Sequence, residues 1–303
     1  MDNIKNIEHI ISAAEASGCT VRRNELLSKY TTFKIGGAAA AVITAENIAV
    51  LSELLKLCKQ YDVKRMIIGN GSNLLVSDDG YDGIVIRLDG DFKNITIDGD
   101  VIKCGSGVTL ASLCKFARDN NLGGLEFAWG IPGTVGGAAF MNAGAYGGEM
   151  KDVILSTSYI TNDGVTGTFV GEDNKLSYRH SVYSENDHVI TGVTFKLSVD
   201  DPELIKERMD DYMTRRRTKQ PLDYPSAGSV FKRPEGFFAG GLIEECGLKG
   251  YGIGGAQVSE KHAGFIINKG TATCDDVCRL VEHIQQTVRE KKGVELECEI
   301  RRI

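Results

Sequence analysis

The residues best suited to chemistry in this chain are glycines that gather in two loops. The first glycine loop follows a short apolar stretch ending at Ile68 and consists of Gly69, Asn70, Gly71, Ser72, Asn73 and Leu74. Glycines leave backbone N–H groups uncovered, and a concave row of N–H groups suits a pyrophosphate. Because a glycine loop alone is more often a tight turn, this segment by itself leaves both interpretations open.

A Rossmann nucleotide site does not explain this first loop. That fold needs a helix directly after the glycines. Here the chain instead passes through Asp/Gly turns at 78–80 and 82–83 into the β-rich run 84–86. The sequence therefore predicts a glycine loop between strands.

The second glycine loop, residues 130–148, changes the balance between these interpretations. It lies where the chain is richest in glycine, and neither helix nor strand periodicity persists through it. Its apolar content argues against disorder, so a functional segment is expected. Two such loops could hold both ends of a large flat cofactor, whereas strained turns explain one loop more easily than two. The candidate binding residues here are Pro132, Gly133, Thr134, Gly136, Gly137, Ala138, Asn142, Gly144 and Ala145.

Hydrophobic periodicity indicates the elements that position these loops. Helices are expected at the N-terminus, at 46–60, at 109–120 after Thr109, from 201 to 215–217 and at 274–291. Strands are expected at 64–68, 83–88, 95–97, 101–104 and at the C-terminal end. Helices and strands mix without a regular βαβ repeat, so the predicted fold class is α+β.

Three of these patterns make predictions about individual side chains. In the helix at 46–60 one face should carry Ile48, Leu51, Leu54, Leu55 and Cys58. In the helix at 274–291 the inward residues should be Val277, Leu280, Val281, Ile284 and Val288. In the terminal strand the inward positions should be Val294, Leu296, Cys298 and Ile300, which alternate with charged residues.

Composition limits the classes of function. With 42% apolar and 25% charged residues, the chain has the composition of an ordinary globular protein. Glycine accounts for 36 of its 303 residues, which is well above the average share of roughly 7%. A net charge of -6 gives no long-range attraction for DNA or RNA. No apolar run is long enough to span a bilayer, and the N-terminal pattern is that of an amphipathic helix and not of a signal sequence. A cytoplasmic protein without membrane insertion or nucleic-acid partners is expected.

The cysteines point in the same direction. Eight of them are scattered without a CxxC pair or a paired Cys/His arrangement. Neither a zinc site nor a disulfide framework is indicated. Reduced, mostly buried thiols and no metal site are therefore expected.

The order of several motifs resembles one flavoenzyme family. The strings GNGSNLL, GIPGTVGGA and NAGAYG look like the FAD-binding domain of UDP-N-acetylenolpyruvoylglucosamine reductase (UDP-N-acetylmuramate dehydrogenase), within the vanillyl-alcohol-oxidase or PCMH type of flavoprotein. The strings SYRHS, PSAGSVFKRP, GLKGYGIGGAQVSEKHAGFIIN and LECEIRRI resemble that enzyme's C-terminal motifs. The resemblance runs from about Tyr30 to the last residue. The stretch between Arg179 and Ser229 is short, so the chain resembles the branch without an extra tyrosine-bearing loop.

The resemblance implies an architecture and a reaction. A PCMH-type FAD-binding domain of two α+β subdomains, split near 93, would span 21–199, after an N-terminal helix at 1–20, and a C-terminal α+β substrate-binding domain would span 200–303. FAD would bind noncovalently and NADPH would donate the hydride. The reaction would reduce UDP-N-acetylglucosamine enolpyruvate to UDP-N-acetylmuramate for peptidoglycan synthesis, with small molecules as the partners. Separately from the resemblance, a monomer is expected.

Three residues match the family's catalytic positions. Reduction of an enolpyruvyl ether needs a hydride at the methylene carbon, a proton at the neighbouring carbon and stabilisation of the charge that develops on the carboxylate. By resemblance, Ser229 is the proton donor, Arg179 contacts the carboxylate and Glu299 is an acid or hydrogen-bond donor. A guanidinium can hold a carboxylate with two hydrogen bonds, and a serine can protonate only an enolate-like acceptor. On sequence alone, a turn serine, a solvated arginine and a solvated glutamate remain the alternatives.

The implied substrate-binding residues lie mainly in the last third of the chain. Lys219 matches a lysine that meets the substrate diphosphate and follows the basic run 215–217, although a solvated helix end is the commoner meaning. The other implied substrate-binding residues are Tyr178, Arg233, Gln257 and His262. Arg233 departs from the asparagine of the other branch, and for His262 a structural role is the alternative.

Two rival functions are retained. One is a different FAD-dependent oxidoreductase of the same superfamily, against which the C-terminal motifs argue. The other is a non-catalytic nucleotide-sugar binding protein, against which the presence of Arg179, Ser229 and Glu299 argues.

Overall fold

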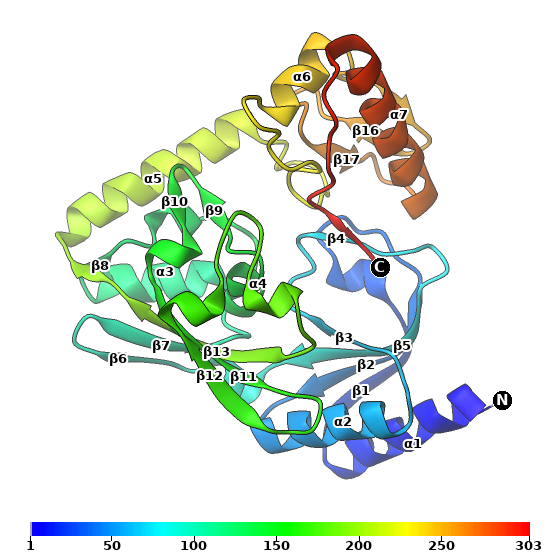
Figure 1. The fold of residues 1–303 in the computed structure, drawn as a ribbon, viewed down its shortest axis with the longest axis vertical. Helices are drawn as coiled ribbons and strands as arrows, with labels where there is room; N and C mark the ends of the chain where they lie inside the picture. The colour runs from blue at the N-terminus through cyan, green and yellow to red at the C-terminus, as the bar shows by residue number, and fades with distance from the viewer. Residues whose placement is uncertain (1) are drawn as a thin grey trace. The chain divides into compact units, whose positions relative to one another are not determined.

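The computed structural model describes residues 2–303, which form two compact units (Figure 1). Unit 1 contains the residues up to Asn24 together with Ala40–Gly69 and Asp82–Thr214, and unit 2 contains Glu25–Ala39, Asn70–Tyr81 and Arg215–Ile303. Helices and predominantly antiparallel strands combine without a βαβ repeat. The predicted α+β class is confirmed.

The first core of unit 1 lies between a four-stranded sheet and two helices. The sheet has the order β1-β2-β5-β3, with the strands Thr20–Leu26 (β1), Ala38–Ala45 (β2), Tyr81–Leu88 (β5) and Arg65–Ile68 (β3). The helices are Asp2–Ala16 (α1) and Ile48–Gln60 (α2). Leu51, Leu54, Leu55 and Cys58 of α2 are buried as predicted, but Ile48 is 41% exposed. Ile48 directly follows the N-cap Asn47 and therefore lies at the open end of the helix, where no neighbouring turn covers it.

The second core of unit 1 is built on an antiparallel sheet. Its strand order is β12-β11-β13-β7-β6, with the strands Thr166–Val170, Ile154–Ile160, Val189–Lys196, Val101–Gly105 and Ile95–Asp98. The helices that contribute to this core are Leu110–Asp119 (α3), Val135–Phe140 (α4) and the beginning of Pro202–Lys219 (α5). Thr109 caps α3 as predicted, because its side chain accepts a hydrogen bond from the Ser112 N–H. Short strand pairs complete the unit: Leu122–Gly123 (β8) with Ser198–Val199 (β14), and Gly144–Ala145 (β9) with Gly148–Glu149 (β10).

Unit 2 packs two helices against a small antiparallel sheet. The sheet consists of Gly252–Ile253 (β15), Ala256–Val258 (β16) and Ile266–Asn268 (β17). The helices are Ala239–Glu245 (α6) and Cys274–Lys292 (α7), and the predicted inward residues of α7 are buried. Arg301–Arg302 (β18) pairs in parallel with Leu74–Leu75 (β4), which directly follows the first glycine loop.

The predicted terminal strand is mostly wrong. Only Arg301–Arg302 is a strand, and Cys298, predicted to point inward, is exposed. The segment before it changes partner along its length: Glu297 and Glu299 bond to the main chain of 230–232, and Arg301 bonds to Asn73. Alternation in the sequence cannot reveal such a change of partner.

Two further features concern the oxidation state of the cysteines and the hydrophobicity of the helices. The cysteines are all free, and most of them are buried. Within residues 2–303, no helix combines the length and the apolar character needed to cross a membrane.

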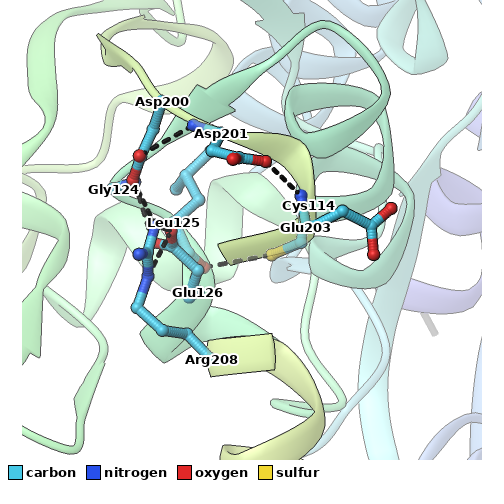
Figure 2. Close-up of polar contacts among 8 residues, drawn as sticks. All are labelled: Cys114, Gly124, Leu125, Glu126, Asp200, Asp201, Glu203 and Arg208. Carbon is cyan, nitrogen blue, oxygen red and sulfur yellow. Dashed lines mark hydrogen bonds and ion pairs between the residues drawn. The ribbon is translucent and has the colours of Figure 1, made fainter. Parts of the chain in front are cut away.

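An ion-pair network fixes the beginning of α5 in unit 1 (Figure 2). Glu126 is only 8% exposed, and its carboxylate accepts hydrogen bonds from the Gly124 N–H at 2.8 Å and from Arg208 Nη2 at 2.7 Å. Arg208 also pairs with Asp200, which in turn accepts a bond from the Asp201 N–H at 2.8 Å. Because a buried carboxylate without a partner costs several kcal/mol, Arg208 makes the position of Glu126 tolerable.

We expect Arg208→Ala to destabilise the protein by about 2–3 kcal/mol, since the buried Glu126 carboxylate would keep the Gly124 N–H but lose the positive charge beside it. The matched control is Lys59→Ala, which removes an exposed pair with Asp163 and should cost less than about 1 kcal/mol. The measurement is the urea midpoint of unfolding. An equally small loss in both variants would contradict the role given to Arg208.

Candidate active site

The second glycine loop is held by the turn between β7 and α3. The N–H of Gly136 donates to the Ser106 carbonyl at 2.9 Å, and the N–H of Val135 donates to the Val108 carbonyl at 2.8 Å. Thr134 caps α4, since its hydroxyl accepts from the Gly137 N–H at 3.4 Å. The loop therefore has a fixed main-chain conformation before α4 begins.

Gly69 lies against this second loop. A Cβ at position 69 would lie 2.3 Å from Thr134 Oγ1 and 3.1 Å from its Cγ2. At Gly71, whose φ is +58°, a Cβ would lie 2.2 Å from the Tyr30 carbonyl oxygen. Both positions therefore require glycine, because any side chain would clash with its neighbour.

Ser106 is a residue that sequence reasoning missed. It is 3% exposed, and its hydroxyl has no hydrogen-bond partner among residues 2–303. Ser106 lies beside Gly136, because a Cβ added to Gly136 would lie 2.8 Å from the Cβ of Ser106. A buried hydroxyl without a partner is uncommon and needs an explanation. The string GSG at 105–107 was the only signal in the sequence.

These features fit the cofactor that the resemblance implies. In unit 1, Gly69 and the 130–148 loop present main chain that a phosphate or a ring can approach closely, and the unpaired Ser106 hydroxyl lies beside Gly136. The predicted individual contacts from Gly69 to Ala145 stay predictions, but the residues present suit a ligand such as FAD.

Asn142 clamps the end of the second loop. Its side chain is fully buried, and its Nδ2 donates to Glu149 Oε2 and to the Ser177 carbonyl, each at 2.9 Å. Its Oδ1 accepts from the Lys151 N–H at 2.8 Å. The ammonium group of Lys151, and then this amide, lower the pKa of Glu149 below its ordinary value. The Asn142 side chain is thus engaged by the protein on both of its polar atoms.

Arg179 lies in a tight turn next to this clamp. Ser177 and His180 exchange main-chain hydrogen bonds of 3.2 and 3.1 Å, so Tyr178 and Arg179 form the turn between them. Arg179 has a φ of +56°, which glycine or asparagine usually occupies. Its guanidinium carbon lies 5.0 Å from the centre of the Tyr178 ring. Strained backbone of this kind is common at functional sites but also occurs elsewhere in this chain, as at Lys34 and Lys175, so the role of Arg179 stays a prediction.

A second bond ties the same turn to the glycine loop. The Ser181 hydroxyl donates to the Phe140 carbonyl at 2.7 Å, and Asn142 already holds Ser177. Unit 1 therefore brings together the second glycine loop and the predicted residues Tyr178 and Arg179.

In unit 2, hydrogen bonds to Glu299 bring Ser229, Glu299 and the first loop onto adjacent segments. The N–H of Glu299 donates to the carbonyl of Val230 at 2.7 Å, and Asn73 Nδ2 donates to the Glu299 carbonyl at 3.2 Å. Ser229 and Glu299 are both half-buried. The segment that carries Glu299 thus lies between the Ser229 segment and Asn73.

His262 lies close to Ser229. Its Nδ1 accepts the Gly264 N–H at 3.1 Å, so in the neutral ring the proton is on Nε2. A Cβ at Gly264 would lie 3.0 Å from His262 Cε1 and 3.6 Å from Ser229 Oγ. Burial lowers the pKa of His262 below its ordinary value, and the charges of Lys249 and Lys219 act in the same direction. His262 is therefore a neutral side chain beside the predicted proton donor.

The remaining predicted substrate residues are more dispersed in unit 2. Lys219 is exposed and is the last residue of α5. The Gln257 amide donates to the Gly250 carbonyl at 2.9 Å, and the Arg233 guanidinium lies over the Phe238 ring at 4.5 Å. Their roles at a ligand stay predictions.

Two family models match separate parts of the chain. A family model described as the FAD binding domain matches residues 39–169, and one described as the UDP-N-acetylenolpyruvoylglucosamine reductase C-terminal domain matches residues 220–303. The UDP-N-acetylenolpyruvoylglucosamine reductase of Syntrophomonas wolfei is 46% identical over 93% of this chain and 94% of its own length. That of Clostridium novyi is 44% identical over 99% of this chain and 96% of its own length.

Solved structures give the same result. The UDP-N-acetylenolpyruvylglucosamine reductase of Thermus caldophilus superposes with a TM-score of 0.82 at 36% identity, covering 94% of this chain and 99% of that one. A berberine bridge enzyme variant, at 18% identity and a TM-score of 0.50, shares the fold over 64% of this chain and 44% of its own. The predicted PCMH-type FAD-binding domain with a further C-terminal domain is confirmed. The chain belongs to the UDP-N-acetylenolpyruvoylglucosamine reductase family of FAD-dependent oxidoreductases.

Proposed function

We propose that this protein reduces UDP-N-acetylglucosamine enolpyruvate to UDP-N-acetylmuramate, with NADPH as the hydride donor, in the synthesis of peptidoglycan precursor. The observation that carries the proposal is the placement of Ser229 beside neutral His262 and on the segment adjoining Glu299, within the domain that the family's C-terminal model matches. A hydroxyl and a carboxyl group on adjacent segments would suit the proton transfer that the reaction needs.

The two glycine loops would hold FAD noncovalently. Main-chain groups of 69–74 and 132–145 are the proposed contacts, and the Ser106 hydroxyl is an available hydrogen-bonding group beside them. When bound, the flavin supplies a hydride acceptor and donor that no side chain can replace.

The chain's own residues act on charge and protons. Arg179 can hold the substrate carboxylate with two hydrogen bonds while negative charge develops there. Ser229 Oγ gives its proton to the carbon next to the methylene carbon. Glu299 acts in the same reaction as an acid or a hydrogen-bond donor to the substrate. Serine is a weak acid, so this transfer requires the strongly basic, enolate-like carbon that hydride addition creates.

The proposal also covers substrate recognition, cellular location, oligomeric state and domain boundaries. Lys219 would meet the diphosphate, and Tyr178, Arg233, Gln257 and His262 would contact the substrate. We further infer a cytoplasmic monomer with the domain boundaries 1–20, 21–199 and 200–303.

The direct test of the function is anaerobic absorbance at about 450 nm, where oxidised flavin absorbs. NADPH should bleach the FAD-loaded protein, and the enolpyruvyl sugar should then restore the band. Bleaching without recovery would indicate a different FAD-dependent oxidoreductase, and a protein that takes up no FAD would indicate a flavin-free binding protein.

Gly69→Ala should weaken FAD binding by about 100-fold or more, because its Cβ would displace Thr134 from the second loop. Titration of the apoprotein with FAD, followed by flavin fluorescence, measures the dissociation constant. Gly241→Ala is the matched control, since the nearest atom to its Cβ would be 3.9 Å away. Equal affinities in the two variants would rule out the first loop as a cofactor site.

Ser229→Ala should slow reoxidation of the flavin by the enolpyruvyl sugar by about 10²–10⁴-fold, the usual contribution of a positioned proton donor. Bleaching by NADPH should keep its rate, because no proton from Ser229 is needed in that half-reaction. Stopped-flow absorbance separates the two steps, with Ser226→Ala in the same loop as the control. Reoxidation at the wild-type rate would exclude Ser229 as the donor.

A further inference from the structure

The turn between β9 and β10 holds a tyrosine in an unfavourable backbone conformation. Ala145 pairs with Gly148, so Tyr146 and Gly147 form a two-residue turn with φ of +54° and +91°. Positive φ at both positions is the pattern of a type I′ turn, which favours Asn-Gly. A tyrosine in this place is disfavoured locally, so contacts of its side chain must offset the strain.

The Tyr146 ring stacks on Tyr212 of α5. The ring centroids are 4.6 Å apart and the planes differ by 5°. Figure 1 shows the β9–β10 hairpin beside α5. Stacked aromatic pairs at this spacing stabilise a protein by more than the burial of their apolar surface alone would.

Both ends of this contact are anchored in unit 1. On α5, Tyr212 lies four residues after Arg208 and therefore on the same face of the helix, which the Glu126 pair fixes. At the base of the hairpin, Asn142 holds Glu149 and Lys151. The hairpin is thus fixed by an amide at its base and by a stacked ring at its tip.

We propose that Tyr212 is a positioning residue for FAD. Its ring holds Tyr146 in the left-handed conformation and so keeps the main chain of 144–148 in the shape that binds the cofactor. Without this contact Tyr146 loses compensation for its strain, and the turn relaxes toward conformations that tyrosine prefers. The inference rests on the proposed cofactor site in the second glycine loop.

The test compares FAD dissociation constants from fluorescence titration of apoprotein, at a temperature where circular dichroism shows every variant folded. Tyr212→Ala should weaken FAD binding by about 5- to 20-fold, and Tyr212→Phe, which keeps the ring, should remain within about 2-fold of wild type. Tyr251→Ala is the matched control, because it removes a similar stack on His283, at 4.4 Å and 19°, in unit 2. Its FAD affinity should equal that of wild type.

A double-mutant cycle shows whether Tyr212 acts through Tyr146. In a Tyr146→Asn background, which suits the type I′ turn, Tyr212→Ala should have no further effect on FAD affinity. An equal effect in both backgrounds, or wild-type affinity in Tyr212→Ala, would overturn this inference alone. Failure of the wild-type protein to bind FAD would overturn the proposed cofactor site as well.

Discussion

The side chain of Asn142 makes three hydrogen bonds in a position without access to water, and the arrangement of the unit 1 loops depends on them. Through Glu149 and Lys151 it closes the β9–β10 hairpin, and through the Ser177 carbonyl it holds the turn that carries Arg179. A buried polar group left without its partners costs more than an average hydrogen bond contributes. Loss of one of the three Asn142 bonds is therefore expected to loosen both the β9–β10 hairpin and the turn at 177–180.

Around this clamp the chain accepts local strain. Asn142, Tyr146 and Arg179 all have positive φ although none is glycine. Asn142 is held by its buried hydrogen bonds and Tyr146 by a stacked ring. The turn that carries Arg179 is held by the bonds from Asn142 to Ser177 and from Ser181 to Phe140. Strain that surrounding structure offsets is a common property of binding sites, because it fixes groups in positions that a relaxed loop would leave. The glycines at 69 and 71 have a different role, because they permit close contacts with neighbouring residues that any Cβ would prevent.

The sequence predicted those parts of the fold that depend on local periodicity. The buried faces of α2 and α7 and the Thr109 cap follow from side-chain spacing, and the absence of a helix after the first loop follows from its turn residues. Sequence could not predict features that tertiary contacts create: the partner change in the terminal segment, the Glu126–Arg208 pair, or the unpaired hydroxyl of Ser106. Ser229, Arg179 and Glu299 are predicted from resemblance only, because nothing in their immediate neighbours distinguishes them. The strained φ of Arg179 became visible only in the folded chain.

The measurement that tests the clamp most directly is hydrogen exchange in Asn142→Asp. The substitution keeps the shape of the side chain but replaces its N–H donors with a carboxylate facing Glu149 and the Ser177 carbonyl. We expect the amides of 142–151 and 177–181 to lose protection together, while those of the β7, β11 and β13 strands keep theirs. Wild-type protection in both segments, or loss in only one of them, would contradict the claim that one buried amide holds these loops together.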